Sequence, residues 1–217
     1  MRLSIDCKAT VKIGPYSRGG KTRGDNQAAD HDMGCRETYT PFGVVNEETG
    51  ELHLTFGSSA KTSDFIVDAL QGWWEHCSPV QRERLTCLQI KADNGPESNG
   101  QRTQFLKRMV DFADAIGKPI QLLYYPPYHS KYNPVERCWG ILEKHWNGAQ
   151  LTDSQTMLAW AKSMTWKGLH PVVQLTRKVY EKGVSLSRQA MRAVEARLER
   201  NPILPKWDIL IRPACVV

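Results

Sequence analysis

The chain has 217 residues, of which 41% are hydrophobic and 24% are charged, as in an ordinary globular protein. No run approaches the roughly 18–20 consecutive apolar residues of a membrane helix, and Asp6 comes too early for a secretory signal peptide. The six cysteines are scattered without a Cys-x-x-Cys pair, which favours reduced thiols over a disulfide scaffold or a zinc site. We therefore exclude membrane-spanning and secreted classes and expect a cytoplasmic protein.

The charge is unevenly distributed along the chain. Lysine and arginine number 29 against 23 aspartates and glutamates, and the whole excess of +6 lies in residues 150–217. A second basic stretch, free of acids, contains Lys8, Lys12, Arg18, Lys21 and Arg23. Basic patches on a nearly neutral body suit a polyanion such as nucleic acid, because contacts with phosphates release counterions. A merely solvated basic surface is the alternative.

Hydrophobic periodicity predicts strands that alternate with helices. Strands are expected at 3–13, 38–45, 51–56, 85–92 and 119–125. Helices are expected at 64–76, 101–116, 134–146, 153–165 and 187–200, with Thr62 or Ser63, Gly117 and Asn133 as caps. Three successive strands followed by alternation predict an α/β fold: a mixed five-stranded sheet flanked by helices, in ribonuclease H-like order, with a helical C-terminal extension.

Three carboxylates occupy positions where this topology brings them together. Asp6 lies inside the first strand, Asp93 directly follows the fourth, and Glu136 lies in the first turn of the helix after Pro126-Pro127. If the first and fourth strands are neighbours, Asp6 and Asp93 meet, and the helix places Glu136 over the same edge. Clustered carboxylates repel one another unless a cation neutralises them. Hard oxygen ligands favour Mg²⁺ or Mn²⁺, and two such ions can hold the oxygens of a phosphodiester.

One segment resembles a known motif. Residues 124–139, Tyr-Tyr-Pro-Pro-Tyr-His-Ser-Lys-Tyr-Asn-Pro-Val-Glu-Arg-Cys-Trp, resemble the third-carboxylate motif of DDE transposases. Together with Asp93-Asn94-Gly95-Pro96, Trp73-Trp74 and the tail at 180–184 and 205–208, they are similar to the ISAzo-thirteen-like insertion-sequence transposases. The similarity runs from Asp6 to Pro213.

The resemblance implies an enzyme that uses two Mg²⁺ or Mn²⁺ ions, held by Asp6, Asp93 and Glu136. Such an enzyme cleaves DNA at transposon ends and transfers the 3′-hydroxyl into target DNA. It also implies a bacterial, nucleoid-associated protein that acts as a homo-oligomer. The residues expected to contact DNA are Lys8, Lys12, Arg18, Lys21, Arg23, His129, Lys131 and Arg137. Trp139 is expected to pack and fix its helix, and the roles of Asp30, His31, Asp32 and Glu97 stay open.

These expectations divide the chain into a catalytic domain at 1–150 and a basic, mostly helical extension at 151–217. The first catalytic strand begins at residue 3, so we expect no N-terminal DNA-recognition domain in this sequence. Two alternatives remain. One is a truncated, non-catalytic DNA-binding or regulatory remnant of a transposase, and the other is a different ribonuclease H-like nuclease.

Overall fold

The computed structural model describes residues 1–19, 28–29, 34–126 and 129–214. Two of the expected DNA contacts, Lys21 and Arg23, lie outside the described residues, as do Asp30, His31 and Asp32. Among the described helices, none has the length and apolar character needed to cross a membrane.

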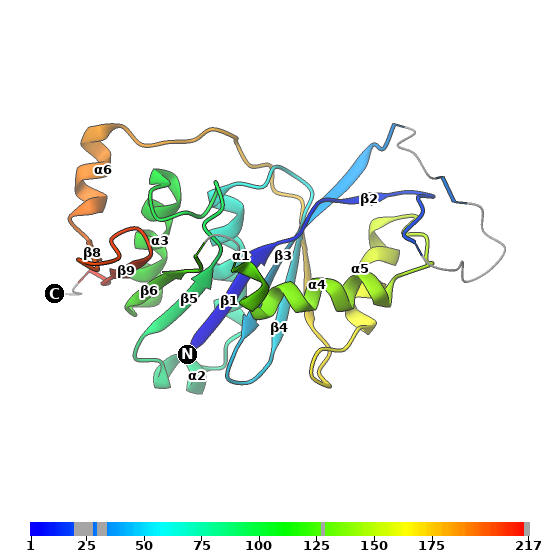
Figure 1. The fold of residues 1–217 in the computed structure, drawn as a ribbon, viewed down its shortest axis with the longest axis horizontal. Coiled ribbons are helices and arrows are strands. Elements are labelled where there is room, and N and C mark those ends of the chain that lie inside the picture. The colour runs from blue at the N-terminus through cyan, green and yellow to red at the C-terminus, as the bar shows by residue number, and fades with distance from the viewer. Residues whose placement is uncertain (20–27, 30–33, 127–128, 215–217) are drawn as a thin grey trace.

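Five strands form the centre of the sheet (Figure 1). They are β1 (Arg2–Cys7), β3 (Glu37–Asn46), β4 (Leu52–Gly57), β5 (Leu88–Ala92) and β6 (Ile120–Tyr124). Their order is β4-β3-β1-β5-β6; β3 is antiparallel to β1 and β4, whereas β1, β5 and β6 run parallel. The first and fourth predicted strands are therefore neighbours, and the fold is the ribonuclease H-like α/β sheet that the sequence predicted.

The sheet is nonetheless larger than the five strands expected, because nine strands of the described part of the chain take part. The predicted strand at 3–13 is two strands, β1 and β2 (Val11–Ile13), and β2 pairs with β3. Near the C-terminus, β7 (Val172–Thr176) lies parallel to β4. At the other edge, β9 (Asp208–Ile211) pairs with β6, and β8 (Leu198–Arg200) pairs with β9.

The C-terminal extension that was expected to be mostly helical contains strands as well as helices. Beyond residue 150 the two helices are α5 (Ser154–Ser163) and α6 (Arg188–Glu195), and three strands of the common sheet accompany them. The helix predicted at 187–200 ends at Glu195, because residues 198–200 pair with β9 instead. Sheet edges offer unpaired backbone groups, and pairing with them overrides the helical periodicity of a short segment.

Helices cover both faces of the sheet. One hydrophobic cluster joins the sheet to α1 (Ser63–His76) and α3 (Thr103–Ile116), and a second joins it to α4 (Pro134–His145) and α5. Two short elements, α2 (Pro79–Arg84) and η1 (Ser130–Tyr132), precede β5 and α4. Along β3 the side chains alternate between the clusters, with Phe42 and Val44 in the first and Val45 in the second. Both faces are buried, as a ribonuclease H-like sheet requires.

The helix ends follow the sequence prediction in two of three cases. The Thr62 side chain accepts a hydrogen bond from the Phe65 N–H at 3.2 Å, and Gly117 ends α3 in the left-handed conformation with φ 63°. Asn133 stands at the N-cap position of α4 but makes no capping hydrogen bond with its side chain. The expectation that Asn133 caps this helix is wrong, because its amide is bound elsewhere.

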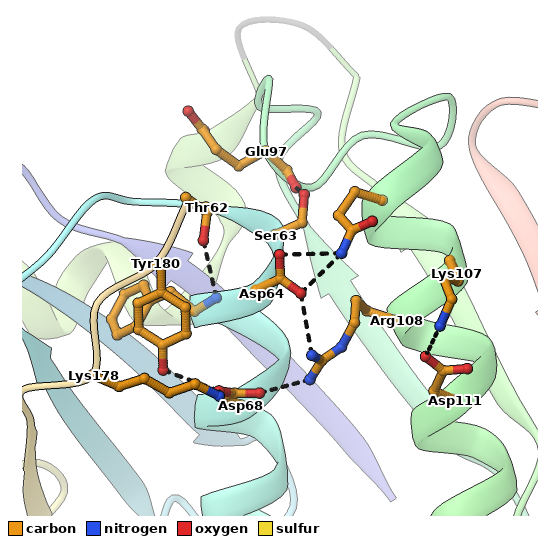
Figure 2. A network of polar contacts seen from close by, with 12 residues as sticks. Thr62, Ser63, Asp64, Asp68, Glu97, Lys107, Arg108, Asp111, Lys178 and Tyr180 are labelled. Carbon is orange, nitrogen blue, oxygen red and sulfur yellow. Dashed lines mark hydrogen bonds and ion pairs between the residues drawn. The ribbon is translucent and has the colours of Figure 1, made fainter. Parts of the chain in front are cut away.

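A polar network fastens the segment between β7 and α6 across α1 and α3 (Figure 2). Asp68 of α1 receives Arg108 of α3 at 2.6 Å, Lys178 at 2.6 Å and the Tyr180 hydroxyl at 3.1 Å. Burial raises the pKa of Asp68, but the hydrogen bonds from Lys178 and Arg108 outweigh it and hold that pKa below its ordinary value. The chain therefore neutralises this acid with its own cations.

Candidate active site

The first two candidate carboxylates lie at neighbouring strand ends. Asp6 is the next-to-last residue of β1, and Asp93 directly follows β5, the parallel neighbour of β1. Parallel strands place their carboxyl ends at the same edge of a sheet, and a small pocket there is lined by Asp6, Asp93, Cys7 and Lys61, among others. The topology thus brings together two acids that are 87 positions apart.

The third carboxylate, Glu136, is carried by the first turn of α4, which packs against β1. Burial raises the pKa of Glu136, the negative charge of Asp93 raises it further, and the nearby Lys8 opposes these effects. Glu136 is therefore within electrostatic reach of the two strand-end acids, although it belongs to a different element.

Asp6 is the most strongly perturbed of the three. Its pKa rises from 3.8 to about 7, mainly because the carboxyl group is buried, and the charges of Glu136 and Asp93 add to the rise. The indole N–H of Trp139 opposes it by donating a hydrogen bond to Asp6 Oδ2 at 2.7 Å. The pKa values of Asp6 and Glu136 thus stay raised although Lys8 and Lys61 lie nearby, a pattern characteristic of functional carboxylates.

The residues present fit a hard divalent cation. Their donors are carboxylate oxygens, which Mg²⁺ and Mn²⁺ prefer, and a cation would relieve the repulsion that raises the pKa values of Asp6 and Glu136. Within the described ranges, no three His, Cys, Asp or Glu side chains are gathered as a group that could hold one ion. The fit to a divalent cation is therefore supported by the chemistry of the carboxylate donors and not by a preformed cluster of ligands.

A larger cavity of about 580 Å³ lies beside the carboxylates. It extends between the start of α1, the loop after Asp93 and the segment at 181–184, and Lys61 lines both this cavity and the small pocket at Asp6. Lys61 Nζ lies 3.3 Å from Glu97 Oε2. Ser63, which lies beside Glu97 in Figure 2, donates a hydrogen bond to the Glu97 carbonyl at 2.7 Å. Sequence reasoning missed Lys61; its place just before the predicted helix cap was the available signal.

The basic arm expected to contact DNA has contacts within the chain where it is described. Lys8 Nζ forms an ion pair with Glu143 Oε1 at 2.6 Å, and the Arg18 guanidinium lies over the Trp146 ring at 5.0 Å. Arg18 also donates to the Lys12 carbonyl at 3.0 Å. Lys12 itself is exposed on β2. The side chains of Lys8 and Arg18 thus have structural partners, which a net charge count could not show.

The three expected contacts around η1 are exposed. His129 stacks on Tyr132 with ring centroids 5.9 Å apart, and Lys131 lies over the same ring at 5.2 Å. Arg137 follows Glu136 directly on α4. These residues therefore lie near Glu136 along the chain and are accessible to a ligand.

The family model of the Rhodopirellula transposase DDE domain matches residues 1–213. The chain belongs to this family. The match confirms the kinship with ISAzo-thirteen-like DDE transposases that the motif around Glu136 indicated. No curated protein matches the chain.

One solved structure resembles the transposase DDE domain weakly. A chain of the cryo-EM structure of the simian T-cell lymphotropic virus intasome in complex with PP2A regulatory subunit B56 gamma shares 16% sequence identity with it, at a TM-score of 0.43. The match covers 82% of the DDE domain chain and 63% of the other, so this chain spans less than two thirds of the one it resembles. The assignment of the ribonuclease H-like fold therefore rests on the strand order and not on this similarity.

Proposed function

We propose that this transposase DDE domain cleaves DNA phosphodiesters at transposon ends and joins the freed 3′-hydroxyl to target DNA. The observation that supports it most is the convergence of Asp6, Asp93 and Glu136: the pKa values of Asp6 and Glu136 are raised by burial and by the neighbouring carboxylates, and the nearby Lys8 does not cancel the rise at Glu136. A structural acid is normally paired, as Asp68 is.

In this proposal the three carboxylates hold two Mg²⁺ or Mn²⁺ ions. When bound, such ions activate a water or hydroxyl nucleophile and stabilise the charge on the attacking and leaving oxygens. Asp6 and Asp93 supply ligands from rigid strand ends, and Glu136 supplies one from α4. The carboxylates hold the metal ions in place and balance part of their positive charge, and none acts as a covalent nucleophile.

DNA is the proposed partner, bound as transposon end and as target. The exposed Lys131 and Arg137 and the side chain of Lys61, all close to the carboxylates in space or sequence, are proposed to contact its phosphates. The remaining basic residues beyond position 150 would extend this contact. Bridging two DNA ends implies a homo-oligomer, which we propose as the active form.

The test is nicking and strand transfer on DNA with Mg²⁺ or Mn²⁺. We expect Asp93→Asn to lower the rate by at least about 10²–10³-fold, because it removes a charged ligand from the reacting centre. Asp111→Asn is the matched control: Asp111 is an exposed acid on α3 paired with Lys107 at 2.5 Å, and its loss should leave the rate unchanged.

Two results would count against the proposal. Equal rates for wild type and Asp93→Asn would exclude a role for this carboxylate in the chemistry. DNA binding by the wild type without cleavage under either metal would favour the alternative of a non-catalytic remnant.

A further inference from the structure

The start of α4 is tied directly to β1 by buried polar groups. Ser4 and Asn133 have no exposed surface, and the Ser4 hydroxyl donates a hydrogen bond to Asn133 Oδ1. The Asn133 amide donates to the Ile5 carbonyl at 3.1 Å, and the Val135 N–H donates to Ser4 Oγ at 3.0 Å. A hydroxyl of β1 thus serves α4 in place of a local cap, so the helix that carries Glu136 is aligned on the strand that carries Asp6.

One turn further along α4, Trp139 reaches Asp6 itself. Its indole N–H donates to Asp6 Oδ2 at 2.7 Å, while the ring is almost completely buried. An indole nitrogen can only donate, so this contact favours the ionised carboxylate and fixes one of its oxygens. The backbone N–H of Cys7 also hydrogen-bonds to this carboxylate and likewise favours its ionised form.

Gly43 makes the space for this contact. It pairs with Asp6 in the β1–β3 register. A Cβ at position 43 would lie 2.7 Å from Trp139 Cη2 and 2.7 Å from Val135 Cγ2, closer than real contacts allow. The missing side chain therefore lets α4 approach β3 closely enough for Trp139 to reach the neighbouring strand.

We infer that Trp139, seated on Gly43, is a positioning residue that orients Asp6 for divalent-cation binding, an inference that rests on the proposed function of this site. Groups that orient a metal ligand from outside the coordination sphere typically change metal affinity 10–100-fold when they are removed. A tryptophan that merely filled the core would leave metal affinity unchanged when phenylalanine replaced it.

The experiment measures Mn²⁺ binding to the full chain without DNA, by calorimetry, in wild type and Trp139→Phe. Phenylalanine keeps most of the ring and removes the donor, so we expect the Kd for Mn²⁺ to rise about 10-fold. Circular dichroism establishes that the variant is folded. An unchanged Kd in a folded Trp139→Phe protein would overturn the inference.

Gly43→Ala is the second variant, because it keeps the indole N–H but displaces the ring. We expect it to weaken Mn²⁺ binding by at least as much as Trp139→Phe. Gly140→Ala is the matched control: a Cβ at Gly140, adjacent to Trp139 on α4, meets nothing within 4 Å, and Mn²⁺ affinity should not change. Equal Mn²⁺ affinity in Gly43→Ala and Gly140→Ala would contradict the inference.

A spectroscopic measurement reports on the contact without any metal. In NMR spectra of the ¹⁵N-tryptophan-labelled protein, the Trp139 indole N–H signal is the one that is absent in Trp139→Phe. We expect its chemical shift to change in Asp6→Ala. An unchanged chemical shift in Asp6→Ala would overturn the inference. Absence of DNA cleavage by the wild type would instead count against the proposed function alone, because neither readout requires DNA.

Discussion

Two groups of acids in this molecule show opposite electrostatics. At the site formed by the ends of β1 and β5, the pKa of Asp6 is raised to about 7, and the charges of Glu136 and Asp93 contribute to that rise. Between α1 and α3, Asp68 has a lowered pKa, because Arg108 and Lys178 outweigh the cost of its burial. Both acids are partly removed from water, so burial alone does not separate them. The difference lies in the cations that the chain supplies.

The comparison indicates which carboxylates stabilise the folded state and which destabilise it. Asp68 joins two helices and the segment after β7, so its negative charge contributes to stability (Figure 2). Asp6 would be better neutral in the isolated chain, and its retention as an acid points to a ligand that is not part of the polypeptide. Replacing each acid by its amide should therefore have opposite effects.

The largest expected effect is a gain of stability in Asp6→Asn. A folded-state pKa of about 7 against 3.8 means that ionisation at neutral pH destabilises the fold, by at most about 4 kcal/mol. The loss of stability begins above pH 3.8 and is complete above the folded pKa. We expect Asp6→Asn to raise the free energy of unfolding by about 2 kcal/mol at pH 8 with EDTA present, measured by urea denaturation.

Mg²⁺ sharpens this prediction. Added Mg²⁺ should raise the Tm of the wild type by binding the folded state, and should raise that of Asp6→Asn much less. Equal free energies of unfolding of the two proteins in EDTA would show that the charge of Asp6 does not destabilise the fold. The contrast between Asp6 and Asp68 would then be wrong.

The next effect has the opposite sign. Asp68→Asn removes the negative charge and one of the two carboxylate oxygens that accept from Arg108, Lys178 and Tyr180. It should lower the free energy of unfolding by about 1–2 kcal/mol at pH 7. Because the folded-state pKa of Asp68 is lowered, its contribution is fully present above its ordinary value and disappears as the pH falls through the folded value. Urea titrations from pH 7 downward should show the two proteins converging in acid. If the free energies of unfolding of wild type and Asp68→Asn still differ below the folded-state pKa of Asp68, the ion pairs are not the cause of the difference.

The smallest effect belongs to Lys178→Ala. The Lys178 side chain is 61% exposed, so its ion pair with Asp68 is screened by water, and we expect a loss of no more than about 0.5 kcal/mol. A loss as large as that of Asp68→Asn would mean that Lys178, rather than Arg108, dominates the network. Thermal melts of the three proteins in the same buffer decide between these outcomes.

Local sequence patterns were enough for the central sheet and for the placement of its acids. The sequence placed Asp6 inside the first strand, Asp93 directly after the fourth and Glu136 in the first turn of a helix. That Asp6 lies near a strand end became clear only when the strand expected at 3–13 divided into β1 and β2. The strands β7, β8 and β9 were missed because they are three to five residues long and exist through pairing. The run Val172-Val173-Gln174-Leu175-Thr176 was the one visible sign of them.

The contacts around Asp6 could not be predicted in the same way. Trp139 lies 133 positions from Asp6, and its spacing on α4 is equally that of a core residue. Gly43 sits inside a strand without a turn to explain it, and only the packing of α4 shows why a side chain is excluded there. Such roles depend on three elements at once, and a single sequence does not reveal their distances.

The closure of both sheet edges by the last part of the chain has a consequence for biosynthesis. Until residues 172–176 and 208–211 leave the ribosome, β4 and β6 present unpaired backbone groups along hydrophobic strands. The nascent protein is therefore open to self-association until these two segments have been made, and chaperones that shield strand edges should improve its yield. Premature termination before residue 208 would leave that hazard permanent.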